Sequence, residues 1–258
     1  MASAVVVFDF DKTILDCDVD EWLSEKMGVS QFFSQLLPTI SWNSAMDRVM
    51  TELHSKGTTI QDISECLKQV PMPPRIVSAI RSAHAFGCDL RILSDASVFA
   101  IETVLRHNGL IDFFSEINTN PSHVDVDGRL RILPYHDFKT SSPHGCTICP
   151  PNMCKGMVME RIRASVSGDR KKRFIYVGDG ASDFCASLRL EEGDFMMPRK
   201  KYPFCELLCT NRMLTKATIR PWSNEDDFEA VLLTLIKTIC IEENCRMRPD
   251  PMLIPSRL

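Results

Sequence analysis

Two aspartates follow directly on an apolar run near the start of the chain, and this arrangement indicates chemistry. The run covers residues 5–8, Asp9 comes next, and Asp11 follows after one intervening residue. A buried strand that ends in two carboxylates is costly unless the charges meet a metal ion or other partners. In open α/β sheets, ligands bind at the carboxyl ends of the strands. We therefore expect Asp9 and Asp11 to be catalytic.

Further polar residues stand at the ends of later predicted elements: Ser94, Lys155, Asp179 and Asp183. Taken singly, each has an ordinary explanation as a helix cap, a solvated lysine or an Asp-Gly turn. Taken together, they fit phosphoryl transfer. Carboxylates hold a hard divalent cation, one carboxylate attacks phosphorus, and a hydroxyl and an ammonium group hold the phosphoryl oxygens.

The elements that must position these residues alternate between strand and helix. Apolar, β-branched runs predict strands at residues 5–8, 88–93, around 117, 173–177 and 195–197. Segments with helical spacing separate them, and a last amphipathic helix is predicted over residues 227–242, capped by Ser223 or Asn224. This alternation predicts an α/β fold with a doubly wound, Rossmann-like parallel sheet.

A helical insert is predicted directly after the first strand. Between Ile14 and Pro73 the apolar residues recur at helical spacing, Thr59 and Asp62 form a capping pattern, and no convincing strand appears. We predict a catalytic core made of residues 1–14 and 86–258, with residues 15–85 as an all-helical cap. A hairpin is predicted at residues 124–133, because Asp127 and Gly128 supply its turn chemistry.

Composition narrows the class of protein. The chain has 258 residues, 44% of them hydrophobic, with a net charge of −4 and a pI of about 5.9. These values argue against broad binding to nucleic acid or anionic membranes. No signal peptide or transmembrane span is predicted, so the eleven cysteines are interpreted as reduced thiols of a cytoplasmic enzyme. Oligomeric state stays open.

The motifs together resemble a known enzyme group. Residues 9–13, Ser94, Lys155 and residues 178–183 resemble the four ordered motifs of haloacid-dehalogenase-like phosphatases. Residues 149–155 and 176–185 are more closely similar to the phosphoethanolamine/phosphocholine phosphatase family. That family also includes vertebrate pyridoxal-phosphate phosphatases and plant enzymes acting on pyrophosphate or thiamine phosphate. The insert resembles the cap of the subgroup that includes phosphoserine phosphatase.

The resemblance implies a mechanism and a metal. Asp9 would be the nucleophile that forms an aspartyl-phosphate, and Asp11 would be the general acid and base. Mg²⁺ would be held by Asp9, the backbone carbonyl of Asp11, and Asp179. Phosphoryl oxygens would be bound by Ser94 and Lys155. Two further residues would support the site, namely Thr13 in the first loop and Asp183 behind the metal or the lysine.

The resemblance also implies substrate contacts at Asp20 and Asp95. Two acidic residues near the leaving group would favour a cationic alcohol, as in phosphocholine, phosphoethanolamine or thiamine phosphate, over a second phosphate. Asp20 could instead be a favourable acid in the first turn of a helix. Inorganic pyrophosphate and pyridoxal phosphate stay open as alternative substrates. The expected partner is thus a small phosphorylated metabolite, with no nucleic acid and no membrane.

A loop rich in cysteine offers a second possible metal site. Its thiol and imidazole groups suit tetrahedral Zn²⁺, and they are His144, Cys146, Cys149 and Cys154. Because a second Cys-x-x-Cys pair is missing, reduced thiols that pack the loop are favoured over structural zinc. A non-catalytic, zinc-stabilised interaction protein is the distant alternative. Dinucleotide and P-loop motifs are absent or incomplete, which excludes those nucleotide-binding classes.

Overall fold

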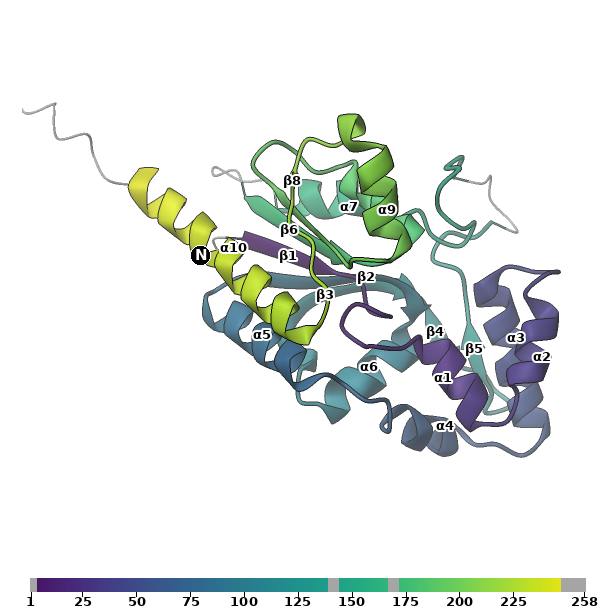
Figure 1. Ribbon diagram of the computed structural model, residues 1–258. Helices are drawn as coiled ribbons and strands as arrows, with labels where there is room; N and C mark the ends of the chain where they lie inside the picture. The colour runs from purple at the N-terminus through teal and green to yellow at the C-terminus, as the bar shows by residue number, and fades with distance from the viewer. Residues whose placement is uncertain (1–3, 139–143, 167–171, 247–258) are drawn as a thin grey trace, which may run out of the picture.

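The computed structural model describes residues 4–138, 144–166 and 172–246, and Figure 1 shows their arrangement. Within these residues, six strands form one parallel sheet in the order β3-β2-β1-β6-β7-β8. The strands are β1 (Ala4–Phe8), β2 (Asp89–Ser97), β3 (Phe114–Asn120), β6 (Arg173–Gly178), β7 (Phe195–Pro198) and β8 (Thr218–Ile219). The predicted α/β parallel sheet is confirmed.

Helices cover both faces of this sheet (Figure 1). They are α1 (Val19–Lys26), α2 (Ser30–Leu36), α3 (Trp42–Ser55), α4 (Ile60–Leu67), α5 (Pro74–Ala85), α6 (Val98–His107), α7 (Lys155–Ser165), α8 (Ala181–Ser187), α9 (Pro203–Thr210) and α10 (Glu225–Arg246), with short 3₁₀ turns at Ile111–Phe113 and Arg212–Leu214. Helices α5 and α10 pack side by side over one face, whereas α7, α8 and α9 pack over the other. Among the described residues, no helix combines the length and the apolar content needed to cross a membrane.

The central strand β1 explains why the chain begins with an uninterrupted apolar run. Val6 and Phe8 belong to the apolar cluster on the α5 and α10 side, while Val5 and Val7 belong to the cluster on the α7 side. All four side chains are almost fully buried. Because successive strand residues point to opposite faces and helices cover both faces, every position must be apolar.

The segment after β1 is helical, as predicted. Asp18 caps α1 by accepting from the backbone of Asp20 and Glu21, and Thr59 forms a capping box at the start of α4. The predicted hairpin is confirmed as β4 (Ser122–Val124) paired with β5 (Leu130–Ile132), and β5 packs against α3. Helices α1 to α4 and this hairpin lie together beyond the carboxyl end of the sheet (Figure 1).

The observed elements differ from the sequence-based expectation at some points and complete it at others. Strand β2 continues past Leu93 to Ser97, because β3 pairs with it up to Asn120 across a register shift. Helix α9 and strand β8 were not expected, since both are short. Asn224 accepts from the backbone N–H of Asp227 at 2.9 Å and is the predicted cap of α10. The division into core and cap stays a prediction, and α5, which it assigns to the cap, packs against α10.

Candidate active site

The predicted site residues gather at the carboxyl edge of the sheet. Asp9 follows β1, Asp179 follows β6, Ser94 lies within β2, and Lys155 begins α7. They border a cavity of about 450 Å³, to which helices α1 and α3 also contribute. The lining residues are Asp9, Asp11, Lys12, Asp18, Asp20, Glu21, Trp42, Asn43, Ser94, Asp95, Ile148, Pro150, Asn152, Lys155, Asp179, Gly180, Ala181 and Ser182.

A buried lysine stands at the centre of this edge. The Lys155 Nζ atom lies 2.8 Å from Asp9 Oδ1 and 2.8 Å from Asp183 Oδ1, and the lysine side chain is 2% exposed. Burial by itself would lower the pKa of Lys155, but the charges of Asp183 and Asp9 outweigh it and raise the pKa well above its usual value. The lysine is therefore a fixed positive charge beside Asp9.

Asp183 is held by hydrogen bonds on both carboxylate oxygens. Its Oδ2 accepts from the backbone N–H groups of Asp179 at 2.9 Å and Gly180 at 2.8 Å. Its Oδ1 accepts from Tyr176 at 2.7 Å and from Lys155 at 2.8 Å. A Cβ atom at Gly178 would lie 2.4 Å from Asp183 Oδ2, so this approach requires glycine. These bonds favour the supporting position predicted for Asp183 over direct ligation of a metal.

The carboxylates of this edge carry more negative charge than Lys155 offsets. Carboxylate oxygens of Asp9, Asp179 and Asp183 all lie within 4.8 Å of one another. Burial, and then the charge of Asp183, raises the pKa of Asp179 to about 6, and the same two causes raise the pKa of Asp9 well above its usual range. Thr13 Oγ1 donates to Asp179 Oδ1 at 3.2 Å. Clustered, buried carboxylate oxygens suit a hard divalent cation.

Asp11 lies in the loop that leads from β1 to α1. Its Oδ1 accepts from the backbone N–H of Val19, the first residue of α1, at 2.8 Å. Burial is the main cause that raises the pKa of Asp11 well above its usual value, followed by the negative charges of Asp18 and Asp20. A raised pKa keeps part of the carboxyl groups protonated nearer to neutral pH, which suits an acid–base role.

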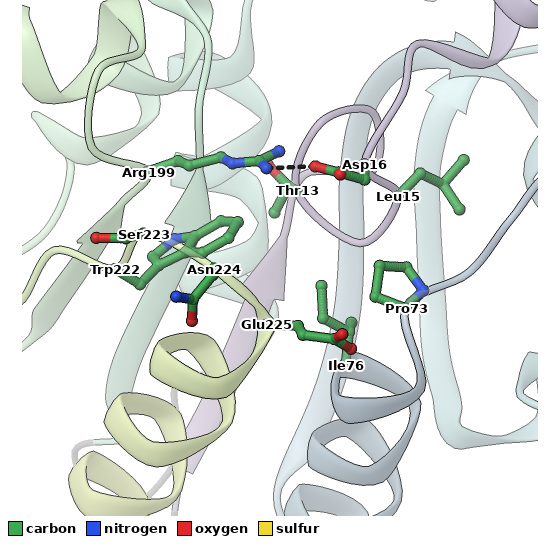
Figure 2. A pocket seen from close by; sticks show the side chains of 10 residues that line it. All are labelled: Thr13, Leu15, Asp16, Pro73, Ile76, Arg199, Trp222, Ser223, Asn224 and Glu225. Carbon is green, nitrogen blue, oxygen red and sulfur yellow. Dashed lines mark hydrogen bonds and ion pairs between the residues drawn. The ribbon is translucent and has the colours of Figure 1, made fainter.

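A second, smaller cavity of about 200 Å³ lies beside the loop that carries Thr13, Leu15 and Asp16 (Figure 2). Arg199 donates to the backbone carbonyl of Lys12 at 2.7 Å. It also forms an ion pair with Asp16, which Figure 2 shows. Lys12 has a φ of 54°, a left-handed backbone conformation that is unfavourable for residues other than glycine. Arg199, which sequence reasoning missed, therefore helps to hold the loop in place.

The two predicted substrate residues both line the large cavity. Asp20 comes from α1, and its Oδ2 accepts from Trp42 Nε1 at 2.9 Å. Asp95 comes from β2 and accepts from Ser182 at 3.1 Å and from Asn152 at 3.4 Å. Trp42, Ser182 and Asn152 were missed by sequence reasoning, because an aromatic in an apolar helix and polar loop residues carry no distinctive signal.

We expect the replacement Asp20→Asn to stabilise the metal-free protein at neutral and higher pH. Burial, and then the charge of Asp18, raises the pKa of Asp20 from 3.8 to about 7. The folded state thus binds more protons than the unfolded state in this window, and stability falls as the pH rises through it. Removing the group should add up to about 4 kcal/mol to the free energy of unfolding above the window, since one pKa unit corresponds to about 1.4 kcal/mol.

The measurement is urea unfolding across a pH series without Mg²⁺ or substrate. The gain should disappear below about pH 4, where the carboxyl is protonated in both states. Asp127→Asn, in the exposed hairpin turn, is the matched control and should show little change at any pH. A gain at Asp20 that does not depend on pH would contradict the assignment of this effect to a buried charge.

The cysteine loop differs from the expected ligand set. Among the described residues, four sulfurs lie within 4.8 Å of one another, and they belong to Cys146, Cys149, Cys154 and Cys185. His144 is not in this cluster, because its Nε2 contacts the carbonyl of Pro150 at 3.0 Å and its Nδ1 accepts from the backbone of Cys146 at 3.1 Å. The fourth member is therefore Cys185 in α8, which sequence reasoning did not include.

Known proteins are similar to this chain in sequence or in fold. The profile of the family described as "Putative Phosphatase" matches residues 4–236. "Inorganic pyrophosphatase 2" of Arabidopsis thaliana is 52% identical over 240 residues, which cover 93% of this chain and 86% of the relative. "Thiamine phosphate phosphatase-like protein" of the same plant is 49% identical over 245 residues, which cover 95% of this chain and 100% of the relative.

A less similar relative and a solved structure also match this chain. "Phosphoethanolamine/phosphocholine phosphatase" of Homo sapiens is 31% identical over 246 residues, which cover 91% of this chain and 90% of the relative. The structure of a substrate-bound phosphoserine phosphatase superposes with a TM-score of 0.53 and 12% identity over 84% of this chain and 92% of that one, which shows the shared fold. The chain belongs to the "Putative Phosphatase" family, and it is a phosphatase with a haloacid-dehalogenase-like fold.

Proposed function

We propose that this protein hydrolyses a small phosphomonoester with Mg²⁺, through an aspartyl-phosphate on Asp9. The single observation that carries the proposal is the position of Asp9. Its carboxylate borders the cavity at the end of the central strand, and its Oδ1 lies 2.8 Å from Lys155 Nζ. A carboxylate beside a fixed ammonium group can attack phosphorus while the ammonium offsets part of the phosphoryl charge.

Residues of this chain have separate roles in the two steps of the reaction, phosphoryl transfer to Asp9 and hydrolysis of the aspartyl-phosphate. An Asp9 oxygen bonds to phosphorus as the bond to the leaving alcohol breaks, and Asp11 gives its proton to that alcohol. In the second step Asp11 takes a proton from water, which attacks phosphorus and releases phosphate from Asp9. Ser94 and Lys155 hold the phosphoryl oxygens through both steps. Asp183 keeps Lys155 in position, since they are in contact at 2.8 Å.

The carboxylate edge fits Mg²⁺. Asp9, the backbone carbonyl of Asp11, and Asp179 would hold the ion, because buried carboxylates in excess over lysine need a hard cation with oxygen ligands. The ion would offset the repulsion between the carboxylate nucleophile and the anionic phosphate. Thr13 supports this role through its bond to Asp179.

A cationic leaving group is favoured by the charges around the cavity. Seven acidic side chains line it, against two lysines, and they are Asp9, Asp11, Asp18, Asp20, Glu21, Asp95 and Asp179. The cap segment contributes three of the seven, namely Asp18, Asp20 and Glu21, and we infer that residues 15–85 act as the cap that selects the substrate. Thiamine phosphate, phosphocholine and phosphoethanolamine carry the matching positive charge.

Inorganic pyrophosphate is the second candidate substrate. The 52% identical plant relative is named as an inorganic pyrophosphatase, and Lys12 brings a second positive charge to the cavity wall. Lys12 is close to Asp18 and Glu21, however, at 3.8 Å and 3.5 Å, which partly offsets its charge. Pyridoxal phosphate is a weaker alternative, because its aldehyde-bearing ring offers less positive charge to the acidic wall.

The test compares kcat/KM values with Mg²⁺ across thiamine phosphate, phosphocholine, phosphoethanolamine, pyridoxal phosphate and pyrophosphate. We expect a cationic phosphomonoester to be the best substrate. The variant Asp20→Asn should lower its kcat/KM about tenfold, a loss of about 1.4 kcal/mol of attraction. Hydrolysis of p-nitrophenyl phosphate should hardly change. Equal losses on both substrates would remove Asp20 from substrate selection, and a preference for pyrophosphate would favour the second candidate.

A further inference from the structure

Four cysteine sulfurs come together beside the catalytic edge but outside the cavity. Cys146, Cys149 and Cys154 come from the loop that leads into α7, and Cys185 comes from the middle of α8. The Cys185 Sγ lies 3.6 Å from Cys146 Sγ and 3.9 Å from Cys154 Sγ, and all four sulfurs lie within 4.8 Å of one another. Three of these residues are buried and Cys146 is partly buried.

The spacing of the sulfurs fits a tetrahedral metal centre. Zinc–thiolate bonds of about 2.3 Å at tetrahedral angles place neighbouring sulfurs about 3.8 Å apart. Two of the distances between sulfurs, 3.6 Å and 3.9 Å, lie on either side of that value. A disulfide needs sulfurs about 2.05 Å apart, and all four cysteines are free thiols in this structure.

The surrounding backbone is arranged to receive negatively charged sulfur. The backbone N–H of Cys149 donates to Cys146 Sγ at 3.4 Å. Three more N–H groups, from the first turn of α7, interact with the other sulfurs: Lys155 with Cys149, Gly156 with Cys185, and Met157 with Cys154. Helix N-terminal N–H groups favour the negative charge that a sulfur carries when it binds a metal ion.

A glycine makes the close approach of α8 to α7 possible. A Cβ atom at position 156 would lie 2.7 Å from Cys185 Sγ, a separation that side-chain atoms cannot adopt. The side chain of Cys185 therefore packs directly onto the backbone that follows Cys154 and Lys155. Simple packing of thiols would not require each sulfur to face a backbone N–H group. Metal-bound thiolates, in contrast, are stabilised by such N–H groups.

We propose that Cys146, Cys149, Cys154 and Cys185 bind one structural Zn²⁺ ion. The ion fastens the loop and the start of α7 to α8. It thereby holds both partners of the contact between Lys155 and Asp183 in place. Cys154 directly precedes Lys155, and Cys185 lies two residues after Asp183. The four thiolates select zinc, while the carboxylate oxygens of Asp9 and Asp179 select a harder ion.

The test is metal analysis of the full chain, purified without chelator from medium supplied with zinc. We expect about one zinc ion per chain, bound tightly enough to survive gel filtration. The variant Cys185→Ser should lose most of this zinc. Two controls should keep it: Cys66→Ser, which removes a buried cysteine of α4 outside the cluster, and Asp179→Asn, which alters the carboxylate edge.

Several outcomes would overturn the proposal. Substoichiometric zinc in the wild-type chain would contradict it, as would iron in place of zinc or zinc lost from Asp179→Asn but kept by Cys185→Ser. Should Cys185→Ser fail to fold, the wild-type chain reconstituted with Co²⁺ decides. The intense absorption of tetrahedral cobalt thiolate supports the site, and the weak spectrum of cobalt bound only to oxygen ligands rejects it.

Discussion

Replacing Asp9 with asparagine should abolish phosphatase activity while the chain still folds. The change keeps the size of the side chain but removes the oxygen that would bond to phosphorus. We expect kcat to fall by at least roughly 10³-fold, in line with the loss of a nucleophile in other enzymes that use covalent catalysis. The measurement is steady-state hydrolysis of p-nitrophenyl phosphate with Mg²⁺, together with thermal unfolding of the same preparation.

Stability should not fall with activity, because the buried carboxylate is itself unfavourable. Burial and the charge of Asp183 raise the pKa of Asp9, so its ionised form is destabilised in the folded protein. Lys155 keeps its contact with Asp183 in the variant. The unfolding midpoint should therefore be unchanged or higher. Asp127→Asn is the control with normal activity, and near-normal turnover by Asp9→Asn would show that the nucleophile is another group.

Replacing Lys155 with methionine should destabilise the fold and remove activity together. The lysine is buried between Asp9 and Asp183, and its loss leaves two buried carboxylates without a positive partner. Breaking a buried ion pair on one side typically destabilises a protein by roughly 3–5 kcal/mol. Methionine keeps most of the apolar volume, so the loss reports charge more than packing. Urea unfolding and kcat/KM measure the two effects.

Two further variants separate the effect on stability from the effect on activity. Lys56→Met breaks an exposed pair with Glu52 at 3.0 Å and should change stability by less than about 1 kcal/mol. In the double variant Lys155→Met with Asp183→Asn, one unpaired carboxylate is removed, so stability should partly return while activity stays absent. If Lys155→Met were as stable as the wild type, or if the double variant regained activity, the role given to this lysine would be wrong.

Much of the fold and of the site could be predicted from the sequence, because the information is local. Residues 5–8 must be apolar at every position since both faces of β1 are covered, and a run of that kind is visible without a structure. Polar residues at strand ends must meet at one edge of a parallel sheet. The positions of Asp9, Ser94 and Asp179 around one cavity follow from that rule, whereas Lys155 reaches the same cavity from the start of α7.

Contacts between distant segments were decided only by the tertiary structure. Cys185 lies 31 residues after Cys154 in the chain, so spacing alone favoured the neighbouring His144, which instead contacts Pro150. Trp42 was expected only as part of an apolar stripe, and its bond to Asp20 depends on how helices α1 and α3 are placed relative to each other. The sequence determined which reaction the edge of the sheet can perform, since that chemistry follows strand ends. Packing between helices far apart in the chain decided which side chains line the cavity and which sulfurs meet.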